Sequence, residues 1–96
     1  MANVKFYTTG KQEYITVTKE PLLSQKLSIE AKGALAYFQA VDNTNEINMT
    51  NFQNDNNIGR DKARRILREL EGAGYLSRES SQDDNGVFIW TWEFLL

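Results

Sequence analysis

The chain of 96 residues contains no cysteine and no histidine. Without cysteine it has no disulfides and no thiolate nucleophile, and without both residues it lacks the usual ligands of structural zinc. The missing histidine also removes the commonest general base. Because no other nucleophile and base are assembled by a recognisable motif, we expect a protein that is not an enzyme and that requires no metal or cofactor.

Long apolar runs are also absent. No segment approaches the ~18 consecutive apolar residues of a membrane span, and no basic start is followed by an apolar leader. We therefore expect a cytoplasmic protein with no membrane partner. Its length and its 41% content of hydrophobic residues predict a single domain over residues 1–96.

Positive charge is scarce overall but concentrated locally. The formal net charge is −2, so the long-range field of the protein does not attract phosphate. Of the 11 basic residues, six lie between Arg60 and Arg78. If the chain binds nucleic acid, the attraction must come from this local patch.

The amino-terminal half is predicted to begin with extended structure. Residues 1–13 read as an extended arm, and the β-branched run Tyr14–Thr18 predicts a strand that ends before Pro21. A helix should follow, capped by Ser28 and running to about Val41, with apolar residues at helical spacing.

Two further helices are expected. The first is short, from about Met49 to Asp55, and is followed by a tight turn at Asn56 and Asn57. The second runs from Arg60 to Glu71. Its apolar residues share one face, at the i, i+3, i+4, i+7 spacing of an amphipathic helix: Ala63, Ile66, Leu67 and Leu70.

A β-hairpin closes the chain, expected over residues 75–94. Tyr75–Ser81 and Val87–Phe94 have strand character, and the sequence Asp84-Asn85-Gly86 between them favours a tight turn. The predicted order is β-α-α-α-β-β. This is an α+β fold with three helices and a small antiparallel sheet, the architecture of a winged helix-turn-helix domain.

The sequence also resembles a known family. LSIEAKGALAYF, then IGRDKARRILRELEGAGYLSRE with DDNGVF, is similar to the amino-terminal winged-helix module of phage and plasmid replication initiators and of related small phage regulators. The resemblance covers roughly Tyr14 to Phe88. It implies a recognition helix over Arg60–Glu71 and a wing over Ser77–Phe88. The expected function is sequence-specific binding of double-stranded DNA in a bacterial host cytoplasm, as a transcription regulator or a DNA replication initiator module.

The candidate DNA-binding residues lie mainly on the polar face of this third helix. Arginine pairs with guanine in a bidentate manner, whereas lysine acts as a point charge. We expect Arg60, Arg64 and Arg65 to reach base edges and Lys62 and Arg68 to contact phosphates. Asp61 either accepts a hydrogen bond from cytosine or stabilises the helix dipole. The alternative is a solvated face held by intrahelical pairs such as Asp61 with Arg65.

Three more candidates lie outside that helix. Thr50 and Asn51 on the short helix could donate hydrogen bonds to phosphates, or could simply form a polar surface. Arg78, on the first strand of the hairpin, is expected either to contact phosphate or to form a cross-strand ion pair.

The acidic hairpin tip supports a different class of function. Gln82-Asp83-Asp84-Asn85 is followed by Val87 where wings often carry a basic residue, so the sequence gives little support to a wing that contacts DNA. The alternative function is a winged-helix interaction module that binds a host or replication protein through this wing and the apolar last strand. A homodimer is expected if the DNA site is palindromic.

Overall fold

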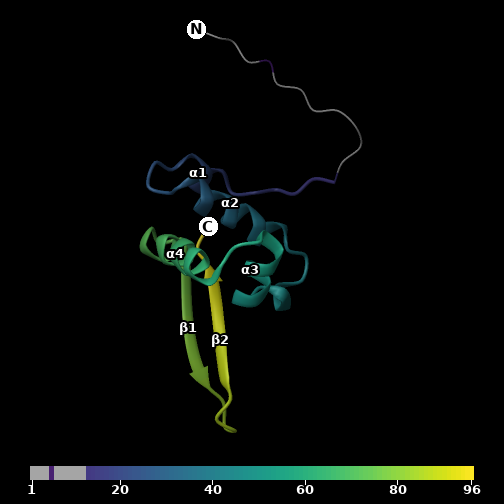
Figure 1. The fold of residues 1–96 in the computed structure, drawn as a ribbon, viewed down its shortest axis with the longest axis vertical. Helices are drawn as coiled ribbons and strands as arrows, with labels where there is room; N and C mark the ends of the chain where they lie inside the picture. The colour runs from purple at the N-terminus through teal and green to yellow at the C-terminus, as the bar shows by residue number, and fades with distance from the viewer. Residues whose placement is uncertain (1–4, 6–12) are drawn as a thin grey trace.

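The computed structural model describes residue 5 and residues 13–96, so the predicted arm over residues 1–13 lies almost entirely outside the described part. The fold is α+β, with a helical layer from which a two-stranded antiparallel sheet projects (Figure 1). None of the helices in the described residues is long and apolar enough to cross a membrane. The elements in chain order are α1 (Lys19–Leu23), α2 (Ile29–Ala40), a turn of 3-10 helix η1 (Thr44–Glu46), α3 (Met49–Asn56), α4 (Arg60–Gly72), β1 (Leu76–Gln82) and β2 (Phe88–Phe94).

The predicted strand over Tyr14–Thr18 is wrong. This segment has no regular structure, and the side chain of Tyr14 is 80% exposed. β-Branched residues form a strand only where another strand pairs with them, and here Thr18 N instead donates to Gln39 Oε1 at 3.0 Å. Pro21 does not end a strand but is buried inside α1, in the first turn of a helix, where its missing N–H has no intrahelical partner to lose.

The start of α2 was predicted correctly and is reinforced by α4. Ser28 Oγ accepts a hydrogen bond from Ala31 N at 3.1 Å, which satisfies one of the free amides of the first turn. The same hydroxyl donates to Glu69 Oε2 at 2.9 Å, and Ser28 N donates to Glu69 Oε1. A carboxylate from α4 therefore lies at the amino-terminal end of α2, where the helix dipole favours negative charge.

A short link joins α3 to α4. The predicted tight turn is present: Asn57 adopts the left-handed conformation with φ 51°, which asparagine tolerates better than other non-glycine residues. Ile58 N donates to Gln53 O at 3.1 Å, and Gly59 occupies the N-cap position of α4. The two helices are therefore held at a fixed turn rather than joined by a loose loop.

The hydrophobic core forms between α2, α3 and α4. The predicted stripe on α4 is fully enclosed, with Ala63, Leu67 and Leu70 at 0% exposure and Ile66 at 4%. Phe38 of α2 lies at the centre of an aromatic cluster, with ring centroids 4.9 Å from Phe52 and 5.0 Å from Phe94. This core fixes the orientation of α4, so the opposite face of that helix is directed outward.

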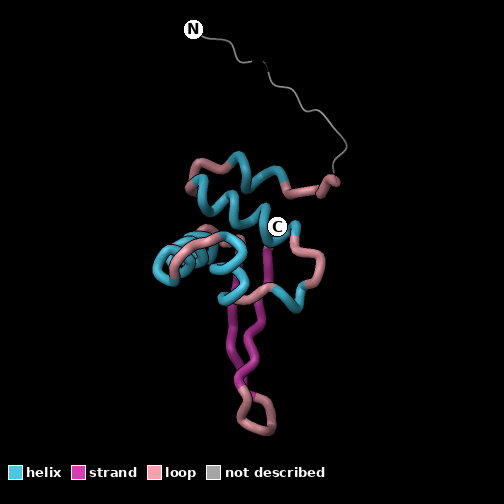
Figure 2. Tube along the Cα trace, turned by 45° about the vertical axis from the view of Figure 1, so that its right-hand side comes forward, coloured by secondary structure: helices cyan, strands magenta, loops and turns pink. Residues whose placement is uncertain are grey.

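The hairpin is covered only at its base. Gly74, with φ 86°, reverses the chain after α4, and the strands pair in register from Leu76 opposite Phe94 to Gln82 opposite Phe88. Of the aromatic residues on β2, Trp92 and Phe94 pack against the core, whereas Phe88 and Trp90 are 66% and 61% exposed. The distal half of both strands extends beyond the helices into solvent (Figure 2).

Candidate nucleic-acid interface

The outward face of α4 carries the basic residues that the sequence predicted. The buried stripe occupies one side of the helix, and every side chain of the predicted site on α4 is exposed on the remaining surface. An α-helix of this kind is narrow enough to enter the major groove of DNA. The residues are Arg60, Asp61, Lys62, Arg64, Arg65 and Arg68.

Two of these cations are paired across helices. Lys62 Nζ lies 3.1 Å from Glu30 Oε2, and Arg65 Nη2 lies 2.9 Å from Glu30 Oε1. The hydrogen bond from Arg65, followed by that from Lys62, lowers the pKa of Glu30, and the same contact raises the pKa of Arg65. The expected intrahelical pair of Asp61 with Arg65 is not among the salt bridges of the described residues. The basic face is instead tied to the first turn of α2.

The other three arginines remain unpaired within the described part of the chain. Glu69 on the same helix bonds to Ser28 rather than to a neighbouring arginine. Within residues 13–96, Arg60, Arg64 and Arg68 have no salt bridge. Arg64 and Arg68 line a shallow hollow together with Asp61 and Arg65. This part of α4 therefore presents guanidinium groups that are available to an external anion.

The α3 candidates divide into one exposed residue and one internally bonded residue. Thr50 is exposed. Asn51 Nδ2 donates to Glu46 O at 2.8 Å, and Asn51 N donates to Asn48 Oδ1 at 2.8 Å. The side chain of Asn51 therefore stabilises the start of α3, and only its carbonyl oxygen is left without a bond within the described residues. The sequence did not anticipate this use.

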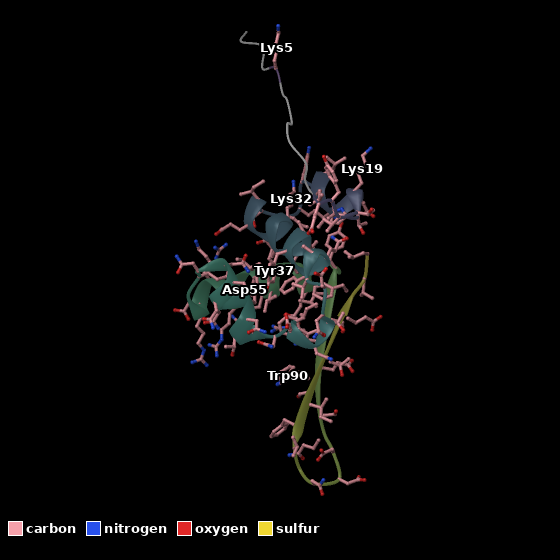
Figure 3. All side chains as sticks on the ribbon, turned by 90° about the vertical axis from the view of Figure 1, so that its right-hand side faces the viewer. Lys5, Lys19, Lys32, Tyr37, Asp55 and Trp90 are labelled. Atoms are coloured by element: carbon pink, nitrogen blue, oxygen red, sulfur yellow. The ribbon has the colours of Figure 1, made fainter. Side chains whose placement is uncertain are left out.

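A second polar contact fixes α3 against α2. Tyr37 Oη donates to Asp55 Oδ2 at 2.6 Å, and the two residues lie side by side in Figure 3. Burial, followed by the neighbouring Asp55 carboxylate, raises the pKa of Tyr37 to about 12. Together with Phe52 in the core, this contact explains how a helix of weak intrinsic propensity is held in place.

Arg78 does not form the cross-strand ion pair that was one of its two predicted roles. Its cross-strand neighbour is Trp92 rather than an acid, with the guanidinium carbon 5.4 Å from the ring centroid. Its ion pair is formed with α4, where Arg78 Nη2 lies 2.7 Å from Glu71 Oε1. The side chain is only 18% exposed, so Arg78 connects the hairpin to α4, and its contact with phosphate stays a prediction.

An apolar hollow lies beside β2. We call it the β2 groove. It has a volume of about 490 Å³ and is lined by Ile47 and Met49 on the η1–α3 side and by Trp90, Trp92, Phe94 and Arg78 on the hairpin side. Nothing in the sequence around Ile47 and Met49 indicated that these residues face β2.

Comparison with protein-family models, with curated proteins and with solved structures gave no match. Inference about function therefore starts from the residues and the geometry of the chain itself.

Proposed function

We propose that this chain is a winged helix-turn-helix protein that binds a specific double-stranded DNA sequence through α4. It acts without catalysis, as a phage- or plasmid-type transcription regulator or replication initiator module. The observation that carries the proposal is the division of α4 into two faces. One face is fully buried, and the other presents Arg60, Arg64 and Arg68 without an acidic partner in the described residues.

The arrangement around α4 supports this proposal. α3 precedes α4 through the tight link 57–59, and a hairpin follows it directly. In a helix-turn-helix unit the second helix enters the major groove while the first crosses the sugar-phosphate backbone. In this assignment α3 is the crossing helix, and Thr50 is its exposed hydrogen-bonding candidate for phosphate.

The contacts on α4 suggest a division of labour among its cations. Arg60, Arg64 and Arg68 are separated by four residues each, so they form one row along the helix, and we assign base-edge contacts to this row. Lys62 and Arg65 lie beside Glu30 at the flank of the helix, and we assign them phosphate contacts for which that carboxylate competes. Arg68 thus moves from a phosphate role to a base-edge role, and Arg65 moves the other way.

The hairpin contributes little to the attraction for DNA in this proposal. Its tip carries Asp83 and Asp84, and Arg78 is already bonded to Glu71. Like charge on the tip and on the phosphates opposes close contact. α4 must therefore supply most of the binding free energy, which makes the proposal sensitive to changes in a few residues.

A duplex-binding titration tests the proposal. A pool of random duplexes is selected against the protein, and affinity for the enriched sequence is measured as salt is varied. Arg64→Ala combined with Arg68→Ala should weaken binding by roughly 30-fold or more, since two base-edge contacts of ~1 to 3 kcal/mol each sum to at least ~2 kcal/mol. The slope of log affinity against log salt should stay steeply negative in the wild type.

The matched control is Lys19→Ala combined with Lys32→Ala. This pair also removes two positive charges, but from the end of the helical layer that lies away from the hairpin (Figure 3). If the control weakens binding as much as the α4 variant, bulk charge rather than a reading helix explains the affinity. If the wild type binds no selected duplex even at low salt, the proposal fails.

One observation favours a second function. Phe88 and Trp90 are exposed on a hairpin whose tip is acidic, which suits a module that binds a host or replication protein. This candidate predicts no duplex affinity and stable capture of a folded partner through the hairpin. The duplex titration separates the two functions, because a pure interaction module would bind no selected duplex. Substitutions on α4 would then leave capture of the partner protein unchanged.

A further inference from the structure

We propose that the outer edge of β2 pairs antiparallel with β2 of a second copy of this chain, and that the exposed aromatic half of each strand fits into the β2 groove of the other. This inference does not depend on DNA binding. It follows from the backbone bonding of the hairpin, from its distribution of charge and from the position of the groove.

The backbone of β2 has unused bonding groups along one edge. Asp83 N donates to Val87 O, and Leu95 N donates to Tyr75 O, both at 3.0 Å. Hydrogen-bonded and non-hydrogen-bonded pairs alternate along an antiparallel ladder, so the odd-numbered residues of β2 bond to β1. The N–H and C=O groups of Phe88, Trp90, Trp92 and Phe94 therefore point to the outer edge, and no described residue bonds to them.

The two edges of the hairpin differ in what they would offer a second strand. β1 carries Arg78 and Glu79 followed by the polar run Ser80–Gln82, and charged or polar edges discourage strand pairing. β2 carries a single charge, Glu93, in the sequence FIWTWEF. An apolar, nearly uncharged edge strand is a template for pairing with another strand.

A two-fold axis through Thr91 matches these bonding groups. The backbone groups of Thr91 point to β1, so Thr91 would lie opposite Thr91 of the second copy as a non-hydrogen-bonded pair. Trp90 would then lie opposite Trp92 of the second copy, and both residues have outward-pointing backbone groups. Glu93 would lie opposite Ile89 of the second copy, so no two like charges are placed directly across the interface.

The same axis brings the exposed and the covered halves of β2 together. Phe88 and Trp90 project from the uncovered part of one hairpin, which lies below the helices in Figure 3. Across the axis they would meet Trp92 and Phe94 of the other copy, next to Ile47 of its β2 groove. Opposite residues of an antiparallel pair share a face of the sheet, so both aromatic side chains would enter the groove.

The available surface is of the size that a dimer requires. Phe88 and Trp90 are each about two-thirds exposed, and large aromatic side chains bury on the order of 150–250 Å² each. Together with Val87 and Ile89, roughly half exposed, they supply on the order of half the ~800 Å² per partner of a standard interface. The paired backbone and the groove walls supply the rest.

Sedimentation across a concentration series without DNA tests the dimer. Trp90→Lys should raise the dimer dissociation constant by roughly 30-fold or more, since a buried tryptophan at an interface centre contributes at least ~2 kcal/mol. Ser80→Lys is the matched control, because Ser80 lies directly opposite Trp90 on β1. The control should remain a dimer. A monomeric wild type, or equal loss in both variants, overturns the proposal.

A cysteine variant tests the register. The chain has no cysteine, so Thr91→Cys introduces one thiol per copy, at an axis where the Cα atoms would be ~4.5 Å apart. That separation permits a disulfide. Mild oxidation should cross-link Thr91→Cys but not Glu79→Cys, whose residue lies opposite Thr91 on β1. Cross-linking of Glu79→Cys alone, or of neither variant, overturns the assigned pairing.

Discussion

α4 and the β-hairpin use their apolar residues in opposite ways. On α4 the apolar side chains occupy one stripe, all of which is buried, and the cations occupy the rest. On the hairpin only Leu76, Trp92 and Phe94 are packed, and the distal half exposes apolar residues on both faces. The apolar face of α4 is therefore fully covered within the chain, whereas the apolar residues of the distal hairpin are not.

The two regions therefore offer a partner different surfaces, positive charge on α4 and apolar area on the hairpin. The unpaired arginines are on α4, and the acidic pair Asp83 and Asp84 is at the hairpin tip. A polyanion is attracted by the first and repelled by the second. A protein surface, including a second copy of this chain, gains most from the exposed aromatics. The two regions can thus bind different partners without competing for the same residues.

The largest effect on stability is expected for a substitution in the buried stripe of α4. Leu67→Ala removes a side chain with 0% exposure, so it should lower the free energy of unfolding by ~2 to 5 kcal/mol through lost burial and the cavity left behind. Trp90→Ala removes a larger side chain but should change stability by no more than ~0.5 kcal/mol in dilute protein. Urea denaturation measures both. Comparable losses in the two variants would mean that the distal hairpin is packed in solution.

An intermediate effect is expected where the two regions meet. Arg78→Ala removes the ion pair with Glu71 and the contact with Trp92, and should cost about 1 to 3 kcal/mol, typical of partly buried hydrogen bonds to charged groups. Arg78→Met keeps an apolar stem near the ring and separates the loss of packing from the loss of charge. In duplex titrations both variants should bind like the wild type. A large loss of affinity would instead indicate that Arg78 contacts a phosphate, as one of the two sequence predictions had it.

Much of the helical part of the fold could be read from the sequence because its signals are local. Ser28 as a cap, the stripe on α4 and the left-handed Asn57 each follow from the chemistry of one residue or from one period. The strand predicted at Tyr14–Thr18 failed because strand formation depends on a partner that the local sequence does not encode.

The candidate site was predictable only in its composition. The spacing of the arginines placed them on one face, but the acids that pair with them are distant in sequence. Glu30 is 35 residues from Arg65, and Glu69 bonds to Ser28, 41 residues away. No period or motif reveals such contacts, because they depend on how α2 and α4 pack. The same limit hid the pairing of Arg78 with Glu71 and the groove beside β2.

The smallest effect is expected for the ion pairs on the basic face of α4. Glu30→Gln removes the carboxylate that holds Lys62 and Arg65. Because all three side chains are substantially exposed, the variant should unfold almost as the wild type does. Its affinity for the selected duplex should rise a few-fold. If a released cation reaches a phosphate, the salt slope should steepen by about 1 for each phosphate that is newly neutralised.

Acid should mimic this substitution for stability, with a defined sign. The pKa of Glu30 is lowered in the folded protein, so the pairing stabilises the fold above the ordinary glutamate pKa and is lost as pH falls through the lowered value. The difference in stability between wild type and Glu30→Gln should therefore shrink in acid. Lys32→Gln, two residues away on α2, is the control for a local polar change. If Glu30→Gln weakens duplex binding while Lys32→Gln does not, then Glu30 positions Lys62 and Arg65 for DNA instead of competing with it.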